Sequence, residues 1–189
     1  MTSTNRSYFD EMYEGDTDPW DFESSAYEQR KYALTMASLP RPRYRSVFEP
    51  GCSIGVLSEM LAARCDRLLA TDIVPAALDR ARNRVGDLRH VVVEQRAIPE
   101  DWPEELFDLV VLSEIAYYFD APDLAHIISL VMRSMANGAQ VLGVHWRGTT
   151  DYPLTGDRVH QIIAATPGLE QVVHHVEPDF VLGVWERRA

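Results

Sequence analysis

The most informative part of the sequence is VFEPGCSIG, at residues 47–55. Its first residues complete an apolar run, RSVFE at residues 45–49, which is typical of a buried strand. A helical pattern follows directly, so Gly51 and Gly55 lie in the turn between a strand and a helix. Glycine permits a tight turn and the close approach of backbone to a ligand. The stretch therefore predicts a ligand site at the carboxyl end of the first strand of an open α/β sheet.

Strand-like and helical segments alternate after this turn. The predicted helices are residues 56–65, 75–85 and 156–166, and the predicted strands are residues 67–72, 90–95, 107–114 and 140–146. Continuous apolar strands of this kind are typical of strands buried on both faces. Two more strand-like segments follow each other closely in the C-terminal tail and indicate an antiparallel hairpin. The pattern predicts an α/β fold whose sheet is mostly parallel, with helices on both faces.

Two helices carry their own boundary signals. Ser25 and Glu28 fit a capping box, which predicts a helix over residues 25–38. Apolar residues recur at helical spacing from Leu124 to Met135, and Asn137-Gly138 is the expected stop of that helix.

The residues before the first predicted helix have a different composition from the rest. Residues 1–24 are rich in aromatic and acidic side chains and are expected to form an N-terminal arm or lid. Residues 25–189 are expected to form one domain, since a domain typically has roughly 100–200 residues.

Composition narrows the classes of function. The chain has 189 residues, 18 Lys and Arg against 29 Asp and Glu, and a net charge of −11. An acidic surface argues against nucleic acid or an anionic membrane as a partner. The chain has only two cysteines, which favours a reduced protein. The sequence also shows no apolar signal-peptide core and no run of roughly 18 apolar residues, so we expect a cytoplasmic protein. The histidines, cysteines and acids show no metal-ligand spacing.

The spacing of the glycines argues against two common nucleotide sites. A dinucleotide fingerprint starting at Gly51 would need glycine where Ser53 and Val56 stand, and no Lys-Ser or Lys-Thr follows for a phosphate-binding loop. Acidic residues remain in the first two strands. Asp72 can accept both hydroxyls of a ribose. Glu49 is either a solvated strand end or the electrostatic partner of a cationic ligand.

These segments together resemble a known enzyme family. The matching stretches are DPW at residues 18–20, YEQR at 27–30, EPGCSIG at 49–55, DIVP at 72–75 and FDLVVLSEIAYYF at 107–119. In this order they resemble the class I S-adenosylmethionine-dependent methyltransferases, and among them the nodulation protein S type, which N-methylates a glucosamine amine of a chitooligosaccharide. The resemblance implies a Rossmann-like sheet and S-adenosyl-L-methionine as cofactor.

The resemblance also implies roles for individual residues. The implied cofactor contacts include Glu49 and Gly51, Cys52 and Gly55 (methionine part), Asp72 (ribose), Ile73 (adenine), Ser113 and Glu114 (amino group and sulfonium), and Trp20 and Arg30 (closing over the cofactor). Ala97 stands where such enzymes usually carry an Asp for the adenine amino group, so adenine recognition is expected from the backbone near Ala97 and Ile98. Residues 145–160 depart from the chitooligosaccharide enzymes, which leaves the acceptor open.

The acceptor side is predicted from residues after the fourth and fifth strands. Tyr117 and Tyr118 are either an aromatic rim for a sugar or for the sulfonium, or ordinary packing. Arg147 is a further expected acceptor contact. His145 and Glu114 are the expected bases, although a structural role for His145 is an equal alternative. The predicted reaction is methyl transfer to a small molecule or saccharide, with an amine nitrogen preferred. The alternatives are O-methylation of a small metabolite and cofactor binding without catalysis, while the failed fingerprint argues against a nicotinamide oxidoreductase.

Overall fold

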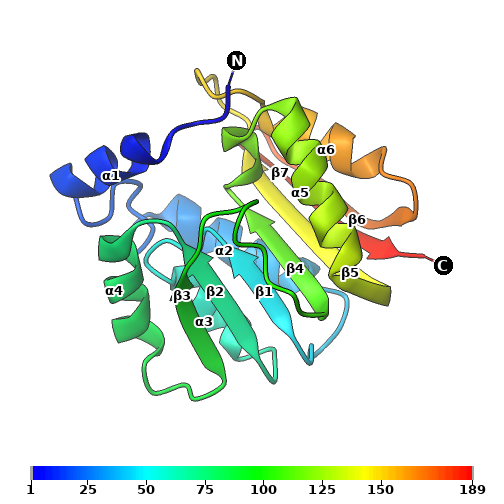
Figure 1. Cartoon of the computed structure of the whole chain (residues 1–189), viewed down its shortest axis with the longest axis horizontal. Helices are drawn as coiled ribbons and strands as arrows, with labels where there is room; N and C mark the ends of the chain where they lie inside the picture. The colour runs from blue at the N-terminus through cyan, green and yellow to red at the C-terminus, as the bar shows by residue number, and fades with distance from the viewer. Residues whose placement is uncertain (1, 189) are drawn as a thin grey trace. The chain divides into compact units, whose positions relative to one another are not determined.

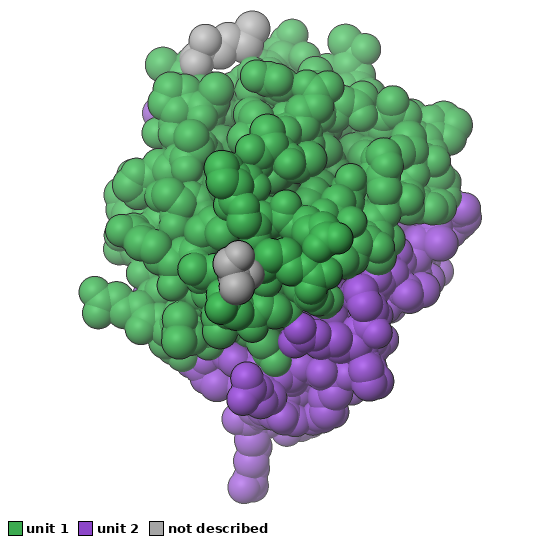
Figure 2. Space-filling model, turned by 90° about the vertical axis from the view of Figure 1, so that its right-hand side faces the viewer, with its two compact units in different colours: residues 1–4, 98–189 green, residues 5–97 purple. Residues whose placement is uncertain are grey.

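The structure is a computed structural model that describes residues 2–188. The chain divides into two compact units, coloured separately in Figure 2. Unit 2 contains residues 5–97, and unit 1 contains residues 98–189 together with residues 1–4. The expected division into an arm (1–24) and one domain (25–189) stays a prediction.

Unit 2 is built on three parallel strands in the order β3-β2-β1 (Figure 1). The elements in chain order are α1 (Arg6–Gly15), α2 (Ala26–Ser38), β1 (Val47–Pro50), α3 (Val56–Ala62), β2 (Leu68–Asp72), α4 (Pro75–Val85) and β3 (Val91–Gln95). Pro50 pairs with Thr71 in the register of β1 and β2. Because the two strands are parallel and in step, the turn after β1 and Asp72 at the end of β2 lie at one edge of this sheet.

Helices α2, α3 and α4 of unit 2 begin where the sequence predicts them. α4 starts with Pro75 and buries Ala77, Leu78, Ala81 and Val85 on one face. α2 begins after Ser25, whose hydroxyl accepts a hydrogen bond from the Glu28 N–H at 3.4 Å. The expectation of burial on both faces is wrong for β3, since this outer strand leaves its residues partly exposed.

Unit 1 has four strands in the order β4-β5-β7-β6. Its elements are β4 (Phe107–Ser113), the 3₁₀ turn η1 (Ala116–Tyr118), α5 (Ala121–Arg133), β5 (Met135–Trp146), α6 (Gly156–Ala164), β6 (Leu169–Val176) and β7 (Phe180–Arg187). β4 and β5 are parallel, whereas β5 with β7 and β7 with β6 are antiparallel. The predicted C-terminal hairpin is therefore confirmed.

The expected end of the helix at residues 124–135 is wrong. α5 ends at Arg133, because the Ser134 N–H donates to the carbonyls of Leu130 and Val131 and closes the last turn. Met135 pairs with Phe107 in the sheet instead of extending the helical face. Gly138 does adopt the left-handed conformation (φ 79°), within an irregular stretch of β5.

Helix α1 was not predicted from the sequence. It has an Asn5 N-cap, whose side chain accepts from the Ser7 N–H at 3.2 Å, and it buries Tyr13. Among residues 2–188, no helix is both long enough and apolar enough to cross a membrane.

Candidate functional site

The glycine turn (residues 51–55) has three residues with a left-handed backbone. Gly51 and Gly55 have φ of 71° and 81°, and Ser53 between them has φ of 49°. A Cβ on Gly55 would lie 3.0 Å from both the Cα and the Cβ of Ala81 on α4, so the glycine also permits close packing of α4 on the turn. The turn places backbone N–H groups just before the N-terminus of α3, an arrangement that suits close approach of a polar ligand.

Glu49 is a buried acid immediately before this turn. The residue is 2% exposed, and one of its carboxyl oxygens, Oε2, accepts a hydrogen bond from the Ser58 hydroxyl at 2.5 Å. Burial raises the pKa of Glu49 from its ordinary 4.5 to about 8; the Ser58 hydrogen bond opposes the rise and the nearby Asp72 carboxylate adds to it. The carboxyl is therefore neutral at pH 7. A cation bound beside it would lower its pKa and so favour the charged carboxylate.

Asp72 supports the turn from the end of β2. Its Oδ2 accepts from the Ser53 N–H at 2.8 Å, and its Oδ1 accepts from the Val74 N–H at 3.0 Å. Burial raises the pKa of Asp72, while these backbone donors oppose the rise. Each carboxylate oxygen has two lone pairs, so these two bonds leave capacity for ligand hydroxyls.

Cys52 lies in the turn with 5% of its surface exposed. Burial is the main reason why the pKa of its thiol is raised well above the ordinary range, and the Asp72 and Glu49 carboxyls add to the rise. A thiol that stays protonated is a poor nucleophile, which agrees with the expected role of a small lining residue.

The N-terminal arm packs on the glycine turn through aromatic side chains. Tyr13 joins Ile54 of the turn in one buried cluster, and Trp20 and Phe22 pack against it. Trp20 stacks on Phe22 with ring centroids 5.5 Å apart. The hydroxyls of Tyr13 and Ser53 also share a hydrogen bond. The structure thus brings Trp20, a predicted cofactor contact, to the turn.

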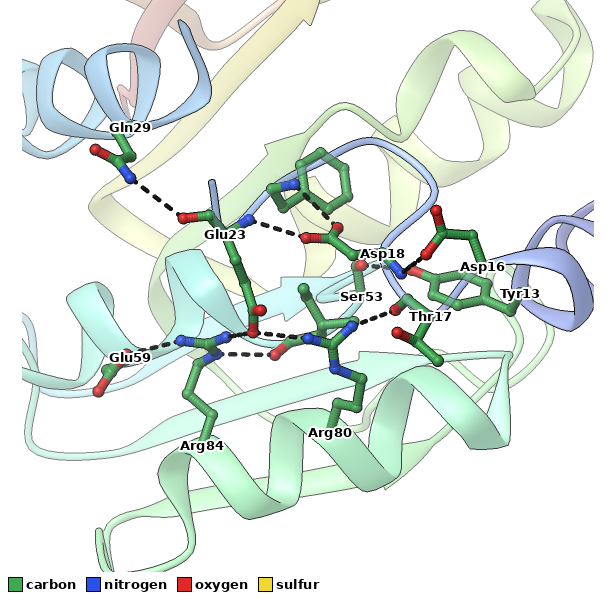
Figure 3. A network of polar contacts seen from close by, with 12 residues as sticks. Tyr13, Asp16, Thr17, Asp18, Glu23, Gln29, Ser53, Glu59, Arg80 and Arg84 are labelled. Atoms are coloured by element: carbon green, nitrogen blue, oxygen red, sulfur yellow. Dashed lines mark hydrogen bonds and ion pairs between the residues drawn. The ribbon is translucent and has the colours of Figure 1, made fainter. Parts of the chain in front are cut away.

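A polar network ties the same arm to α4 (Figure 3). The carboxylate of Glu23 pairs with both Arg80 and Arg84, the former at 2.8 Å. Arg80 also donates to the Thr17 carbonyl, and Arg84 donates to the Ile54 carbonyl at 3.1 Å. Two cations therefore hold one acidic segment of the arm against the helix that follows Asp72.

The remaining predicted cofactor residues of unit 2 are less enclosed. Ile73 is partly buried and packs against the Tyr13 cluster, and its carbonyl accepts from the Gln95 side chain at 3.0 Å. Arg30 lies exposed on α2, and Ala97 is exposed after β3. Ile98, the first residue assigned to the other unit, is partly buried. Their roles stay predictions.

Glu114 is the centre of the polar arrangement in unit 1. It follows Ser113, the last residue of β4, and has φ of 53°, a conformation that costs a non-glycine residue about 1–3 kcal/mol and often marks a functional site. Its Oε2 accepts from the Tyr117 hydroxyl at 2.6 Å and from the Trp146 N–H at 2.9 Å. The carboxylate thereby joins the ends of β4 and β5.

Three tyrosines pack beside Glu114. Tyr117 and Tyr118 are buried in η1, and Tyr152 stacks on Tyr117 with ring centroids 5.2 Å apart and lies 4.6 Å from Tyr118. Burial, and secondarily the Glu114 charge, raises the pKa of Tyr117 well above its ordinary value. Tyr117 therefore acts as a hydrogen-bond donor at neutral pH.

His145 and Arg147 have structural partners. His145 is fully buried; its Nε2 accepts from the Ala116 N–H at 3.2 Å, and its Nδ1 lies 3.2 Å from His160 Nε2. Arg147 donates to both carboxylate oxygens of Asp157, at 3.0 and 3.2 Å, and to the Glu177 carbonyl. The predicted base role of His145 and the acceptor role of Arg147 stay predictions.

Sequence reasoning missed several partners of the site residues. Ser58 could have been found as the small polar residue that follows the glycine turn within α3, nine positions after Glu49. Tyr152 carried no signal, because its stacking on η1 depends on the path of the loop before α6.

Comparison with known proteins adds a family relationship. The family model described as nodulation protein S (NodS) matches residues 8–143. Nodulation protein S of Rhizobium tropici is 32% identical over 127 residues, which are 66% of this chain and 53% of that protein. The chain spans about half the length of the curated relatives it matches.

Solved structures show the same fold. A crystal structure of a candidate methyltransferase from Pseudomonas syringae is 43% identical, with a TM-score of 0.77, over 86% of this chain and all of that chain. The N-methyltransferase NodS from Bradyrhizobium japonicum WM9, crystallised with S-adenosyl-L-homocysteine, is 24% identical, with a TM-score of 0.85, over 95% of this chain and 98% of that one. The predicted class I methyltransferase fold, mostly parallel with antiparallel C-terminal strands, is confirmed.

Proposed function

The chain belongs to the nodulation protein S family, and from this membership we propose that it is an S-adenosyl-L-methionine-dependent methyltransferase. Its acceptor is a small molecule or saccharide, and the methyl group goes to an amine nitrogen. The observation that carries the proposal is the glycine turn, with its two left-handed glycines, its buried acid Glu49 and the Asp72 carboxylate at the same sheet edge. Support for nitrogen as the acceptor atom comes from the N-methyltransferase named among the structural neighbours.

The residues of the glycine turn fit this cofactor. Gly51 and Gly55 leave the backbone open to a ligand, and Asp72 keeps acceptor capacity for a ribose hydroxyl beside its backbone donors. Glu49 is buried with a single hydroxyl donor, and a ligand ammonium would stabilise its charged form. Trp20, Arg30, Cys52, Ile73, Ala97, Ile98 and Ser113 complete the proposed cofactor contacts.

When bound, the sulfonium of the cofactor supplies an already activated methyl group, so the protein's work is binding, orientation and exclusion of water. The acceptor amine must be neutral to attack. We assign the removal of its proton to Glu114, whose other partners, Tyr117 and the Trp146 N–H, fix the carboxylate in place. The geometry favours Glu114 over His145, because both ring nitrogens of the buried His145 already have hydrogen-bond partners.

We also propose that the protein is located in the cytoplasm. Cys52 and Cys65 are buried thiols that are not joined in a disulfide, which supports a reducing environment such as the cytoplasm.

The test is transfer of a labelled methyl group from S-adenosylmethionine to a panel of acceptors. Amino sugars with a free amine are compared with their N-acetylated forms and with sugars that carry only hydroxyls. Label in the free-amine products alone supports N-methylation, and label in the hydroxyl compounds moves the acceptor atom to oxygen. Transfer to none of a broad panel, with the cofactor bound, would support the non-catalytic alternative.

The role of Glu114 is tested in the same assay. Glu114→Gln should lower kcat by about 10²–10⁴-fold, the range for loss of a general base. Glu104→Gln, at an exposed acid of the same unit, is the matched control and should leave kcat unchanged. Equal rates for the two variants would remove Glu114 from the mechanism.

A further inference from the structure

Two buried histidines lie face to edge beneath the acceptor-side residues of unit 1. His145, on β5, has no exposed surface, and His160, on α6, is 6% exposed. The nitrogens His145 Nδ1 and His160 Nε2 lie 3.2 Å apart, and the rings meet edge-on with centroids separated by 5.3 Å. Neither ring faces bulk water, so the hydrogen bond between them lies in an apolar interior where it is strengthened.

The surrounding donors determine where the protons of this pair sit. The Ala116 N–H can only donate, so His145 Nε2 must present a lone pair to it. In a neutral imidazole the proton then resides on Nδ1, which donates to His160 Nε2. His160 in turn carries its own proton on Nδ1, which lies buried and has no hydrogen-bond partner among the described residues.

The groups around His160 keep it uncharged. Burial, followed by the nearby His145 and His174 rings, lowers the pKa of His160 from 6.5 to about 2, and the Asp157 and Glu114 carboxylates oppose this only weakly. A protonated His160 would also turn an N–H toward the N–H of His145. His160 is therefore neutral at physiological pH, and the Ala116 N–H requires an unprotonated Nε2 on His145.

The hydrogen bond that His145 accepts from Ala116 connects it to Tyr117 and Glu114, two residues of the proposed acceptor site. Ala116 is the first residue of η1, and the next residue, Tyr117, donates its hydroxyl to Glu114 Oε2. The same oxygen accepts from the N–H of Trp146, the residue that follows His145. The contacts thus form a closed ring from β5 through η1 to Glu114 and back to β5. Glu114, which has a left-handed backbone, is part of this ring.

We propose that His160 is a positioning residue: by fixing His145 as the Nδ1–H tautomer, it holds Ala116 and the Glu114–Tyr117 pair in place for the acceptor. His160 acts through His145 and does not touch the acceptor. The inference rests on the proposed function for its catalytic consequence, whereas the tautomers of the two rings can be measured without any substrate.

The first test is nitrogen NMR of the ¹⁵N-histidine-labelled protein between pH 5 and pH 8. The expected result is an unprotonated Nε2 on His145, an unprotonated Nε2 on His160, and no titration of His160 in this range. An Nε2–H tautomer on either ring, or titration of His160 between pH 5 and pH 8, would overturn the proposal.

The second test compares two substitutions of His160 in methyl transfer. The amide oxygen of His160→Gln reaches the position of Nε2 and can accept from His145, so turnover should stay near that of the wild type. His160→Leu fills similar space without an acceptor, and kcat should fall by about 10- to 100-fold, the scale for slight misplacement of catalytic groups. KM for S-adenosylmethionine should change less than kcat, because the proposed turn and ribose contacts, at residues 51–55 and Asp72, are in unit 2.

Controls separate the possible failures. His126→Leu, on the exposed face of α5, is the matched control for loss of an imidazole and should keep full activity. Thermal unfolding of each variant shows that activity is compared between folded proteins. Equal loss of kcat in the Gln and Leu variants, with both folded, would contradict the positioning role. Absence of methyl transfer in the wild-type protein would contradict the proposed function and leave the NMR result to decide the tautomers.

Discussion

Glu49 makes the stability of this protein depend on pH in a direction opposite to that of most carboxylates. The residue is 2% exposed, and its carboxyl has a Ser58 hydroxyl as donor and the Asp72 carboxylate nearby. Burial raises the pKa of Glu49 from 4.5 to about 8. Below pH 4.5 the carboxyl is protonated in the folded and unfolded chains alike, so its contribution to stability is fully present.

Between pH 4.5 and pH 8 only the unfolded chain loses this proton. The folded state then binds more protons than the unfolded state, so the free energy of unfolding falls as pH rises. The decrease is about 1.4 kcal/mol per pH unit. Over the interval from 4.5 to 8 it amounts to about 5 kcal/mol, and above pH 8 it is complete.

The perturbation that tests this is Glu49→Gln, which keeps an oxygen for the Ser58 hydroxyl and removes the titration. The assay is urea unfolding of the wild type and the variant at pH 5, 6, 7 and 8. The difference in unfolding free energy between the two proteins should shift in favour of the variant by about 1.4 kcal/mol per pH unit, whatever its value at pH 5. Glu104→Gln, at an exposed position, should follow the wild-type curve. Parallel curves for the wild type and Glu49→Gln would show that folding does not raise the pKa of Glu49.

Three further predictions concern unit 2. Gly55→Ala should lower the free energy of unfolding by at least about 1–2 kcal/mol, the cost of a left-handed non-glycine residue, and urea unfolding should show no such loss for Gly15→Ala, where a Cβ meets nothing within 4 Å. Asp72→Ala should weaken binding of S-adenosylhomocysteine by about 1–3 kcal/mol in calorimetry, and an unchanged dissociation constant would exclude Asp72 from the site. Glu23→Gln should accelerate hydrogen exchange over residues 8–24, because it removes the carboxylate shared by two arginines, and S-adenosylhomocysteine should slow exchange there in the wild type. Identical exchange in all three samples would contradict a ligand-responsive arm.

The elements that could be predicted from the sequence are those with local signals. Helix α4 has a proline at its first position and apolar residues at helical spacing, and it spans Pro75–Val85 as expected. The end of α5 could not be predicted, since Met135 continues the helical pattern in sequence and only its pairing with Phe107 assigns it to β5.

The candidate site was predicted in part for the same reason. The turn could be predicted because glycine is the residue type that readily adopts a left-handed backbone. The left-handed backbone of Ser53 and Glu114 could not be predicted, since neither serine nor glutamate is typical of that conformation. The fixed tautomer of His145 depends on the Ala116 N–H, 29 positions away in sequence, and only the folded chain brings the two together.

We expect the glycine turn and Asp72 to bind S-adenosyl-L-methionine, and calorimetric titration of the purified protein measures this binding. S-adenosylhomocysteine and NAD are titrated separately into the wild-type protein and into Asp72→Ala. We expect saturable binding of S-adenosylhomocysteine that is weakened by the substitution, and no binding of NAD. Saturation by NAD without binding of S-adenosylhomocysteine would show that the turn is not a site for this cofactor.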